Sequence, residues 1–122
     1  MKIRGTDFVL YPVSDFSRAV AFYRDMLGLR PQICSDEWQW AEFDCGNVTL
    51  ALHGGQTVAS AGSGARVALS VADIDAAWAE LTDRGARVFQ PLQDYGVCRS
   101  FAVLDPDGNV VLLHRRADGT FG

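Results

Sequence analysis

The stretches FVLYPVSDFSRAVAFY (Phe8–Tyr23) and RVALSVADIDAAWAEL (Arg66–Leu81) decide the fold, because they are two copies of one pattern. Asp73 lies 58 positions after Asp15, and the same offset holds along the whole stretch. Repetition at a fixed spacing is the signature of a structural unit used twice. The sequence therefore predicts two similar modules.

Each copy begins as a strand and continues as a helix. Alternating apolar residues place one set of side chains on each strand's buried face: Val9, Tyr11 and Val13 in the first copy and Val67, Leu69 and Val71 in the second. Asp15 and Asp73 then stand where a helix N-cap is expected. The helices carry one apolar stripe each and are followed by Gly28 and Gly85, which suit a helix C-terminus.

Three short strands are expected after each helix. They cover about 30–34, 38–44 and 48–53 in the first copy and about 87–91, 99–104 and 110–115 in the second. Asp105-Pro106-Asp107-Gly108 suits a type I turn before the last strand. We therefore predict a single α+β domain over residues 1–122, with two tandem βαβββ modules at about 6–53 and 65–116. The glycine-rich segment 54–64 is expected to be a flexible linker between them.

Composition excludes several classes of protein. The formal net charge is −4, which argues against nucleic-acid and anionic-membrane partners. There is no apolar run long enough for a membrane span, and the first residues lack the apolar segment of a secretory signal. Cys34, Cys45 and Cys98 are odd in number and have no CxxC spacing, so neither a disulfide framework nor a structural zinc site is expected. A cytoplasmic location follows as a prediction.

Several of these motifs resemble the vicinal oxygen chelate superfamily, which contains glyoxalases, bleomycin-resistance proteins and extradiol dioxygenases. They are the Val9-x-Tyr11-x-Val13-x-Asp15 opening, Ala21-Phe22-Tyr23, Leu27-Gly28-Leu29 and Asp105-Pro106-Asp107-Gly108-Asn109. The match runs over about residues 6–116. The resemblance implies two modules that curl into a mixed sheet enclosing a ligand cavity. It also implies a homodimer, because many relatives are dimers.

The resemblance also implies four metal-ligand positions, and these carry the wrong side chains. Carried over residue by residue, the positions are Phe8, Ala51, Arg66 and Leu112. Phe, Ala and Leu offer no lone pair, and arginine is a fixed cation that repels a metal ion. We therefore predict no cofactor and no metal. One alternative stays open: the only two histidines, His53 and His114, lie one step along from two of these positions and could form a displaced site with Glu42.

Without a metal, the inward face of the cavity would carry mostly apolar side chains: Phe8, Leu10, Ala51, Arg66, Ala68 and Leu112. Alternation along a strand over 38–44 would place Trp38 and Trp40 on one face together with Glu42 and Asp44. This pattern is typical of a wall that stacks on a ligand, although a dimer interface or core filling would also explain it. Tyr95-Gly96 and Arg99-Ser100-Phe101 resemble a ligand-contacting segment of bleomycin-resistance proteins. Arg99 could instead pair with Asp94 or Asp105.

These observations predict a metal-free binding protein of the bleomycin-resistance type that sequesters a planar or aromatic ligand, such as a cationic or aromatic antibiotic. The predicted ligand-binding residues are Phe8, Trp38, Trp40, Glu42, Ala51, Arg66, Tyr95, Arg99 and Leu112. The alternatives are a metal-dependent lyase, isomerase or dioxygenase using His53 and His114, and an accessory module without a small-molecule role. Nucleophilic catalysis has little support, because Ser100, Cys34 and Cys98 have no histidine at a recognisable spacing.

Overall fold

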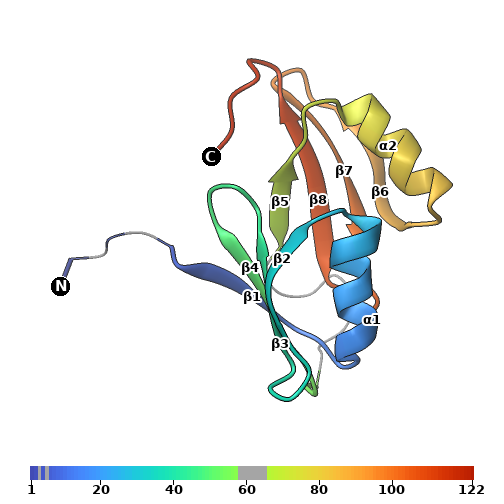
Figure 1. Ribbon diagram of the computed structural model, residues 1–122. Coiled ribbons are helices and arrows are strands. Elements are labelled where there is room, and N and C mark those ends of the chain that lie inside the picture. The colour runs from blue at the N-terminus through green and yellow to red at the C-terminus, as the bar shows by residue number, and fades with distance from the viewer. Residues whose placement is uncertain (3, 5, 58–65) are drawn as a thin grey trace. The chain divides into compact units, whose positions relative to one another are not determined.

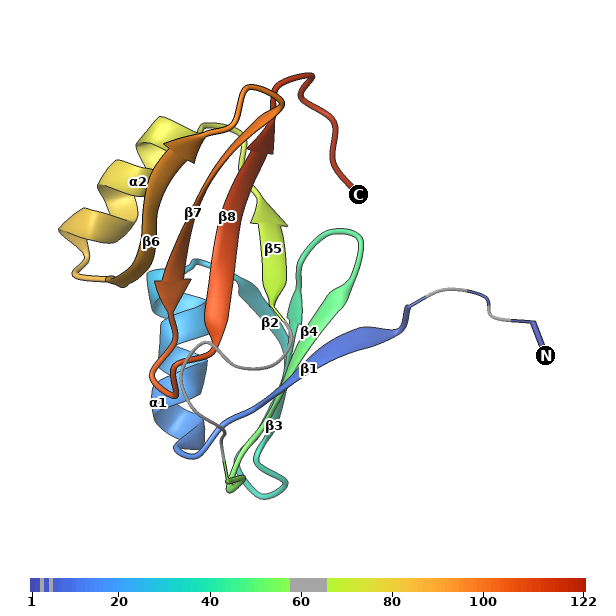
Figure 2. The ribbon, with the colours of Figure 1, turned by 180° about the vertical axis from the view of Figure 1, so that it is seen from behind.

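The computed structural model describes residues 1, 2, 4, 6–57 and 66–122. The chain divides into two compact units, Met1–Val58 and Ala59–Gly122, which we call module one and module two. Each module holds one four-stranded mixed sheet with helix on one side (Figures 1 and 2). The architecture is therefore α+β and built from two βαβββ units, as the repeated sequence predicts. None of the helices in the described residues is long and apolar enough to cross a membrane.

Module one contains four strands, one short α-helix and one π-helical turn. They are β1 (Phe8–Pro12), α1 (Phe16–Ala21), the π-helical turn η1 (Phe22–Met26), β2 (Arg30–Ser35), β3 (Trp40–Asp44) and β4 (Thr49–His53). The strand order is β1-β4-β3-β2. β1 runs parallel to β4, and the other neighbours are antiparallel. This order places β4 in the middle of the sheet, between β1 and β3.

The helix of module one starts and ends at the residues that the sequence indicates. The Asp15 side chain caps α1 by accepting a 3.1 Å hydrogen bond from the Arg18 N–H. The chain then widens into the π turn, where the Leu27 N–H donates to the Phe22 carbonyl at 3.1 Å. Gly28 follows with a φ of 72°, a left-handed conformation that favours glycine. The turn buries Phe22 and Tyr23 against the sheet.

Module two repeats this layout with a longer helix. Its elements are β5 (Val67–Ser70), α2 (Ile74–Asp83), β6 (Arg87–Asp94), β7 (Cys98–Leu104) and β8 (Val110–Arg116). The strand order is β5-β8-β7-β6, with β5 parallel to β8. Asp73 caps α2 by accepting a 3.0 Å hydrogen bond from the Ala76 N–H. The Gly108 N–H donates to the Asp105 carbonyl at 3.0 Å, which closes the predicted turn before β8.

Each core lies between a helix and one face of its sheet. In module one the ring of Tyr23 contacts Tyr11 and Phe43 at centroid distances of 6.5 Å and 6.0 Å. In module two Trp78 on α2 contacts Phe101 on β7 at 5.1 Å, nearly edge to face. These contacts agree with the expected packing of the helix aromatics against the sheet. They also identify which face of each sheet the helix covers.

Two local expectations are wrong. The third strand of module one starts at Trp40, because residues 36–39 form a turn in which Gln39 has a φ of 50°. The linker does not begin as a flexible segment at Gly54, which is buried and donates a 2.8 Å hydrogen bond from its N–H to the Gln39 carbonyl. A Cβ at Gly54 would meet Cβ of Phe16 at 2.8 Å, so only glycine fits there. The rest of the predicted linker, from residue 58 onward, lies outside the described residues.

Candidate ligand-binding faces

The face of each sheet that lies opposite the helix is the candidate site, and we call it the open face. Tyr11 and Phe43 are on the helix side of module one, so strand alternation puts their sequence neighbours on the open face. The register groups these open-face residues into three cross-strand rows: Phe8, Thr49, Asp44 and Arg30; Leu10, Ala51, Glu42 and Ile33; Pro12, His53, Trp40 and Ser35.

Aromatic rings gather over the middle of this open face. The ring of Phe8 on β1 meets that of Trp40 on β3 at 6.0 Å with an interplanar angle of 88°. Trp40 also contacts His53 at 5.7 Å. β4 lies between β1 and β3, and its central open-face residue is Ala51, which is fully buried. Because alanine is small, the two large rings can meet across β4, which makes an edge-to-face aromatic cluster.

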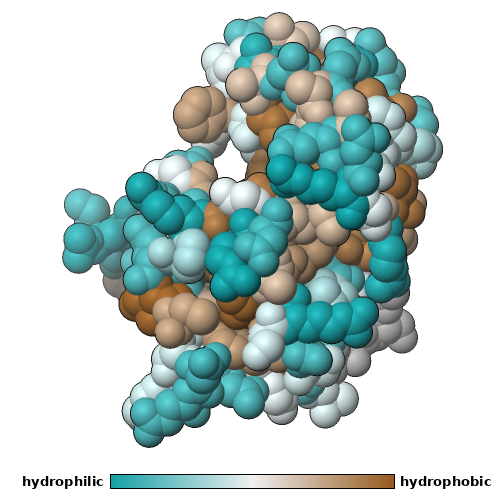
Figure 3. All heavy atoms as spheres, turned by 45° about the vertical axis from the view of Figure 1, so that its right-hand side comes forward, coloured by the Kyte–Doolittle hydropathy of each residue, from teal (hydrophilic) through white to brown (hydrophobic). Residues whose placement is uncertain are grey.

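The aromatic cluster remains partly accessible. Phe8 is 45% exposed although it is apolar, Leu10 is also exposed, and Trp40 is half-buried. Apolar residues are likewise seen among the polar ones on the surface in Figure 3. Accessible aromatic side chains beside polar ones are typical of surfaces that bind small molecules.

One carboxylate on this face has an arginine partner. Asp44 accepts a 3.2 Å contact from Arg30 and a 2.8 Å hydrogen bond from the Gly46 N–H. The Gly46 hydrogen bond is the main cause that lowers the pKa of Asp44, and Arg30 adds to it. Glu42 stands in the central row between Ala51 and Ile33. The face thus combines aromatic rings with a carboxylate in its central row.

Trp38 does not share a face with Trp40. It lies in the turn before β3 and is 74% exposed, and its N–H donates to the Ser35 hydroxyl at 3.2 Å. The expectation of two tryptophans on one strand face is therefore wrong. The alternation of side chains between the two faces does not reach Trp38, because residues 36–39 form a turn and β3 begins only at Trp40.

The open face of module two carries smaller and more polar side chains. The register places Ala68, Leu112, Ala102 and Gln90 in one cross-strand row and Ser70, His114, Ser100 and Gln93 in the next. Ser100 and His114 are thus direct cross-strand neighbours, which sequence spacing did not indicate. A serine takes the position that Trp40 has in module one, so this face lacks the indole.

Two side chains of β6 contact residues outside this strand. The Phe89 ring has the guanidinium carbon of Arg66 over it at 5.3 Å. Gln90, the next residue, donates from Nε2 to the Tyr95 hydroxyl at 2.9 Å. The pairing of β6 with β7 shifts between Val88 and Gln90 and again between Gln90 and Gln93. Sequence reasoning missed Phe89 and Gln90, because a bulge has no reliable sequence signal.

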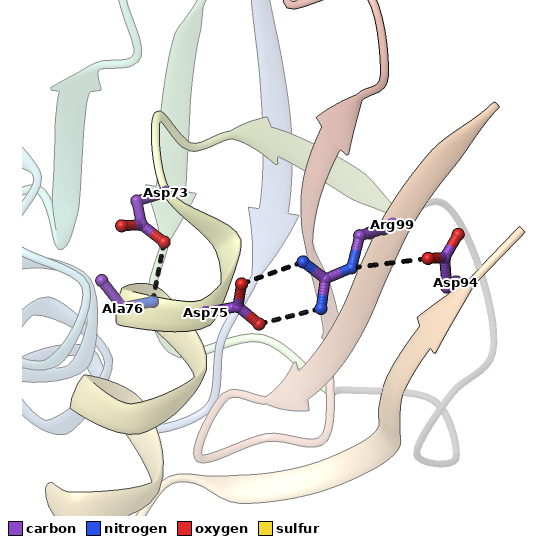
Figure 4. Close-up of polar contacts among 5 residues, drawn as sticks. All are labelled: Asp73, Asp75, Ala76, Asp94 and Arg99. Carbon is purple, nitrogen blue, oxygen red and sulfur yellow. Dashed lines mark hydrogen bonds and ion pairs between the residues drawn. The ribbon is translucent and has the colours of Figure 1, made fainter. Parts of the chain in front are cut away.

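Arg99 lies on the helix side of module two. Its guanidinium donates to both carboxylate oxygens of Asp75, at 3.0 Å and 2.8 Å, and its Nε is 4.0 Å from Asp94 (Figure 4). Asp75 is in the first turn of α2, so this pair links the helix to β7. Of the two partners considered from the sequence, Asp94 lies within ion-pair distance of Arg99, whereas Asp105 accepts a hydrogen bond from the Asn109 N–H in its own turn. The arrangement assigns Arg99 a structural contact away from the open face.

The four family metal positions do not fit a metal ion. Phe8 and Ala51 lie on the open face of module one and Leu112 on that of module two, and the Arg66 guanidinium is against Phe89. None of these side chains can donate an electron pair to a cation. Among the described residues, no group of three or more His, Cys, Asp or Glu side chains could hold a metal. His53 and His114 belong to different modules.

Cys34, Cys45 and Cys98 are all free cysteines. Burial raises the pKa of the Cys45 thiol, which favours the unreactive protonated form.

The chain as a whole is similar to several solved structures. The chain is similar to TnmS3, an antibiotic binding protein from Streptomyces sp. CB03234, with 27% identity and a TM-score of 0.80 over 96% of this chain and 99% of that one. It is similar to TioX from Micromonospora sp. ML1, with 26% identity and a TM-score of 0.75 over 92% and 98%. The fosfomycin resistance protein FosX from Mesorhizobium loti shares the fold, with 22% identity and a TM-score of 0.73 over 93% and 92%.

Comparison with curated proteins gives no match. A family model, by contrast, matches residues 5–113, which is most of the chain and includes both helices. The repeated βαβββ modules agree with that match. The chain therefore belongs to the Glyoxalase/Bleomycin resistance protein/Dioxygenase superfamily.

Proposed function

We propose that this protein is a metal-free binding protein that sequesters a planar aromatic small molecule, such as an antibiotic. The observation that carries the proposal is the cluster of Phe8, Trp40 and His53 on the open face of module one. Its rings are held by strands and by one another, so a flat ligand can stack without ordering a mobile side chain first. The antibiotic-binding TnmS3, at 27% identity, supports this ligand class.

Charge gives the ligand a preferred sign in module one. Glu42 lies in the central row of the open face, next to the aromatic cluster. A carboxylate near aromatic rings favours a cation, by direct attraction and by the negative faces of the rings. We therefore expect planar cations to bind better than neutral molecules of the same shape. This attraction weakens as salt rises.

The test uses proflavine, a planar cation, titrated against the protein and three tryptophan variants. Trp40→Ala should weaken binding at least about tenfold, because stacking and buried area are lost together. Trp38→Ala is the matched control: this exposed turn residue should leave the affinity unchanged. Trp78→Ala should lower stability without a specific loss of affinity, because Trp78 packs on Phe101.

The proposal fails if Trp40→Ala binds proflavine as well as the wild type does. It also fails if Trp38→Ala loses as much affinity as Trp40→Ala. Glu42→Gln should reduce both the affinity and its salt dependence while leaving the fold intact.

Absence of a resident metal is a separate part of the proposal. It rests on the side chains at the four family positions, which offer no donor. Elemental analysis of protein purified without chelator or a nickel column checks it. A stoichiometric transition metal whose retention needs His53 and His114 would favour a metal-dependent enzyme instead.

We also propose that the protein is a homodimer. Each sheet ends in two edge strands, β1 and β2 in module one and β5 and β6 in module two, and edge strands are places where a second copy can associate. Sedimentation equilibrium at micromolar concentration should give about twice the chain mass, and a monomer would contradict the proposal.

A further inference from the structure

A row of polar side chains crosses the open face of module two. From β5 to β6 its members are Ser70, His114, Ser100 and Gln93, which the register places side by side. Hydroxyl, imidazole and amide groups can each offer a hydrogen-bond donor and an acceptor, and none of them carries a permanent charge. Neighbouring strands are about 4.8 Å apart, so three adjacent members span about 10 Å. The row therefore presents several uncharged hydrogen-bonding groups within reach of one small ligand.

Ser100 is nearly buried without a hydrogen-bond partner for its side chain. It is only 7% exposed, and its hydroxyl makes no hydrogen bond with any group of the described residues. Phe101, the next residue, packs on Trp78 of α2, so alternation directs Ser100 to the open face. The described residues hold no fully buried side-chain oxygen that lacks a partner, so this hydroxyl reaches the accessible surface. A polar group in such a position calls for a partner from outside the chain.

An aromatic ring lies beside this row. Asp94 pairs with Arg99 on the helix side, so alternation puts Tyr95 on the open face together with Gln93. The Tyr95 hydroxyl accepts a 2.9 Å hydrogen bond from Gln90 Nε2, which holds the phenol alongside β6. Tyr95 is 53% exposed, so much of its ring stays accessible. An aromatic ring next to hydrogen-bonding groups suits a ligand that has both apolar and polar surface.

The arginine in the next row of this sheet already has an anionic neighbour. Arg116 lies opposite Cys98, and its guanidinium donates to Thr120 Oγ1 at 3.3 Å in the C-terminal tail. Hydrogen bonds from Thr120 lower the pKa of Asp118 in the same tail, and the charge of Arg116 adds to this effect. The positive charge beside the polar row is therefore matched within module two. A neutral ligand with several hydroxyl groups fits the row better than an anion does.

We propose that the open face of module two binds a neutral sugar ring, with Ser100, His114 and Gln93 as hydrogen-bonding groups and Tyr95 as the stacking ring. Sugar hydroxyls are donors and acceptors at once, which matches the mixed character of the row. The C–H groups on one face of a sugar ring are apolar and pack on an aromatic side chain. A flat aromatic cation, the ligand class proposed for module one, would leave most of the row unpaired. This inference rests on module two alone and does not depend on the proposed function.

The experiment titrates the protein with the methyl glycosides of glucose, galactose and mannose, and with cyclohexanol as a ring that has a single hydroxyl. Two-dimensional NMR measures the affinities and locates the site by amide chemical shifts. At least one glycoside should bind about tenfold more tightly than cyclohexanol, because each additional hydrogen bond contributes about two- to tenfold in affinity. The shifted amides should include those of β7, β8 and the Tyr95 loop.

Variants then separate ligand binding from a structural role. Ser100→Ala should weaken the preferred glycoside about three- to tenfold, whereas its unfolding temperature should not fall, because no hydrogen bond among the described residues is lost. Tyr95→Ala removes the stacking ring and should weaken binding at least about tenfold. Tyr95→Phe keeps the ring and should retain most of the affinity. Ser17→Ala is the matched control: this exposed serine on α1 of module one should leave the affinity unchanged.

The outcomes distinguish this site from the proposed function. Equal binding of the glycosides and cyclohexanol, or equal affinities of Ser100→Ala and Ser17→Ala, would overturn the sugar site, and so would amide shifts confined to module one. If proflavine binds through Trp40 and no glycoside binds, the function proposed for module one stands and this inference falls. If glycoside binding needs Ser100 while proflavine does not bind, the sugar site stands and the proposed function falls. Thermal unfolding of each variant confirms that it is folded.

Discussion

The two modules have one scaffold and two different open faces. Equivalent cross-strand positions in the two sheets carry different residues. Trp40, Glu42 and Ala51 in module one correspond to Ser100, Ala102 and Leu112 in module two. Where module one has rings and a carboxylate, module two has small, polar and cationic residues. The difference teaches that two copies of one fold can present different side chains on their open faces, since the aromatic core contacts of each module lie on the other face of its sheet.

The helix sides of the two modules remain alike. Asp15 and Asp73 cap their helices in the same way, with hydrogen bonds of 3.1 Å and 3.0 Å. Gly28 and Gly85 end them with φ values of 72° and 78°. Local backbone groups must be satisfied wherever a helix begins or ends, so these positions are constrained in both copies. The comparison can therefore be tested by changing one side of a sheet at a time.

The largest effect is expected from exchanging the central residues of the open faces. Ala51→Leu adds bulk at a fully buried position and should push Phe8 away from Trp40, which lowers the free energy of unfolding by about 1–3 kcal/mol. Proflavine binding should fall with it. The reciprocal Leu112→Ala removes a half-buried side chain and should cost only about 1 kcal/mol. Urea unfolding gives both values, and an equal loss in the two variants would contradict the difference between the faces.

A smaller and equal effect is expected on the helix sides. Asp15→Ala and Asp73→Ala each remove one N-cap hydrogen bond and should each cost about 0.5–2 kcal/mol. Hydrogen exchange, read separately for the amides of α1 and α2, measures the loss in each module. Asp83→Ala, at the opposite end of α2, is the control and should not unprotect the first turn.

The smallest effect concerns the ion pair between Asp75 and Arg99, which has no counterpart in module one at the same place. The hydrogen bond from Arg99 lowers the pKa of Asp75 in the folded protein. The carboxylate therefore adds stability above its ordinary pKa near 3.8, and this contribution is lost as the pH falls through the lower, folded-state value. Asp75→Asn should reduce the acid-dependent part of stability below about pH 4. The exposed site makes the effect small, and urea midpoints at several pH values measure it.

Much of the fold could be predicted from the sequence, whereas the site could be predicted only in part. Strand alternation placed Phe8, Ala51 and Leu112 on open faces, because alternation is a local property of extended chain. It failed for Trp38, because Gln39 adopts a left-handed φ that ends the alternation. Local hydrogen bonds to Ser35 and Asp36 contribute to that turn, and a hydrogen bond from Gly54, fifteen positions later in the chain, adds a contact that no local rule indicates.

The sequence by itself determined the repeat, the helix caps, the membership of the superfamily and the absence of donor side chains at its four metal positions. These properties depend on neighbouring residues or on residue identity alone. Tertiary structure decided that Phe8 meets Trp40, that Arg99 is held by Asp75, and that Phe89 and Gln90 bring Arg66 and Tyr95 to one strand. Apart from the Gln90–Tyr95 hydrogen bond, these contacts join residues far apart in the chain, and they arise only when strand order, register and bulges bring those residues together.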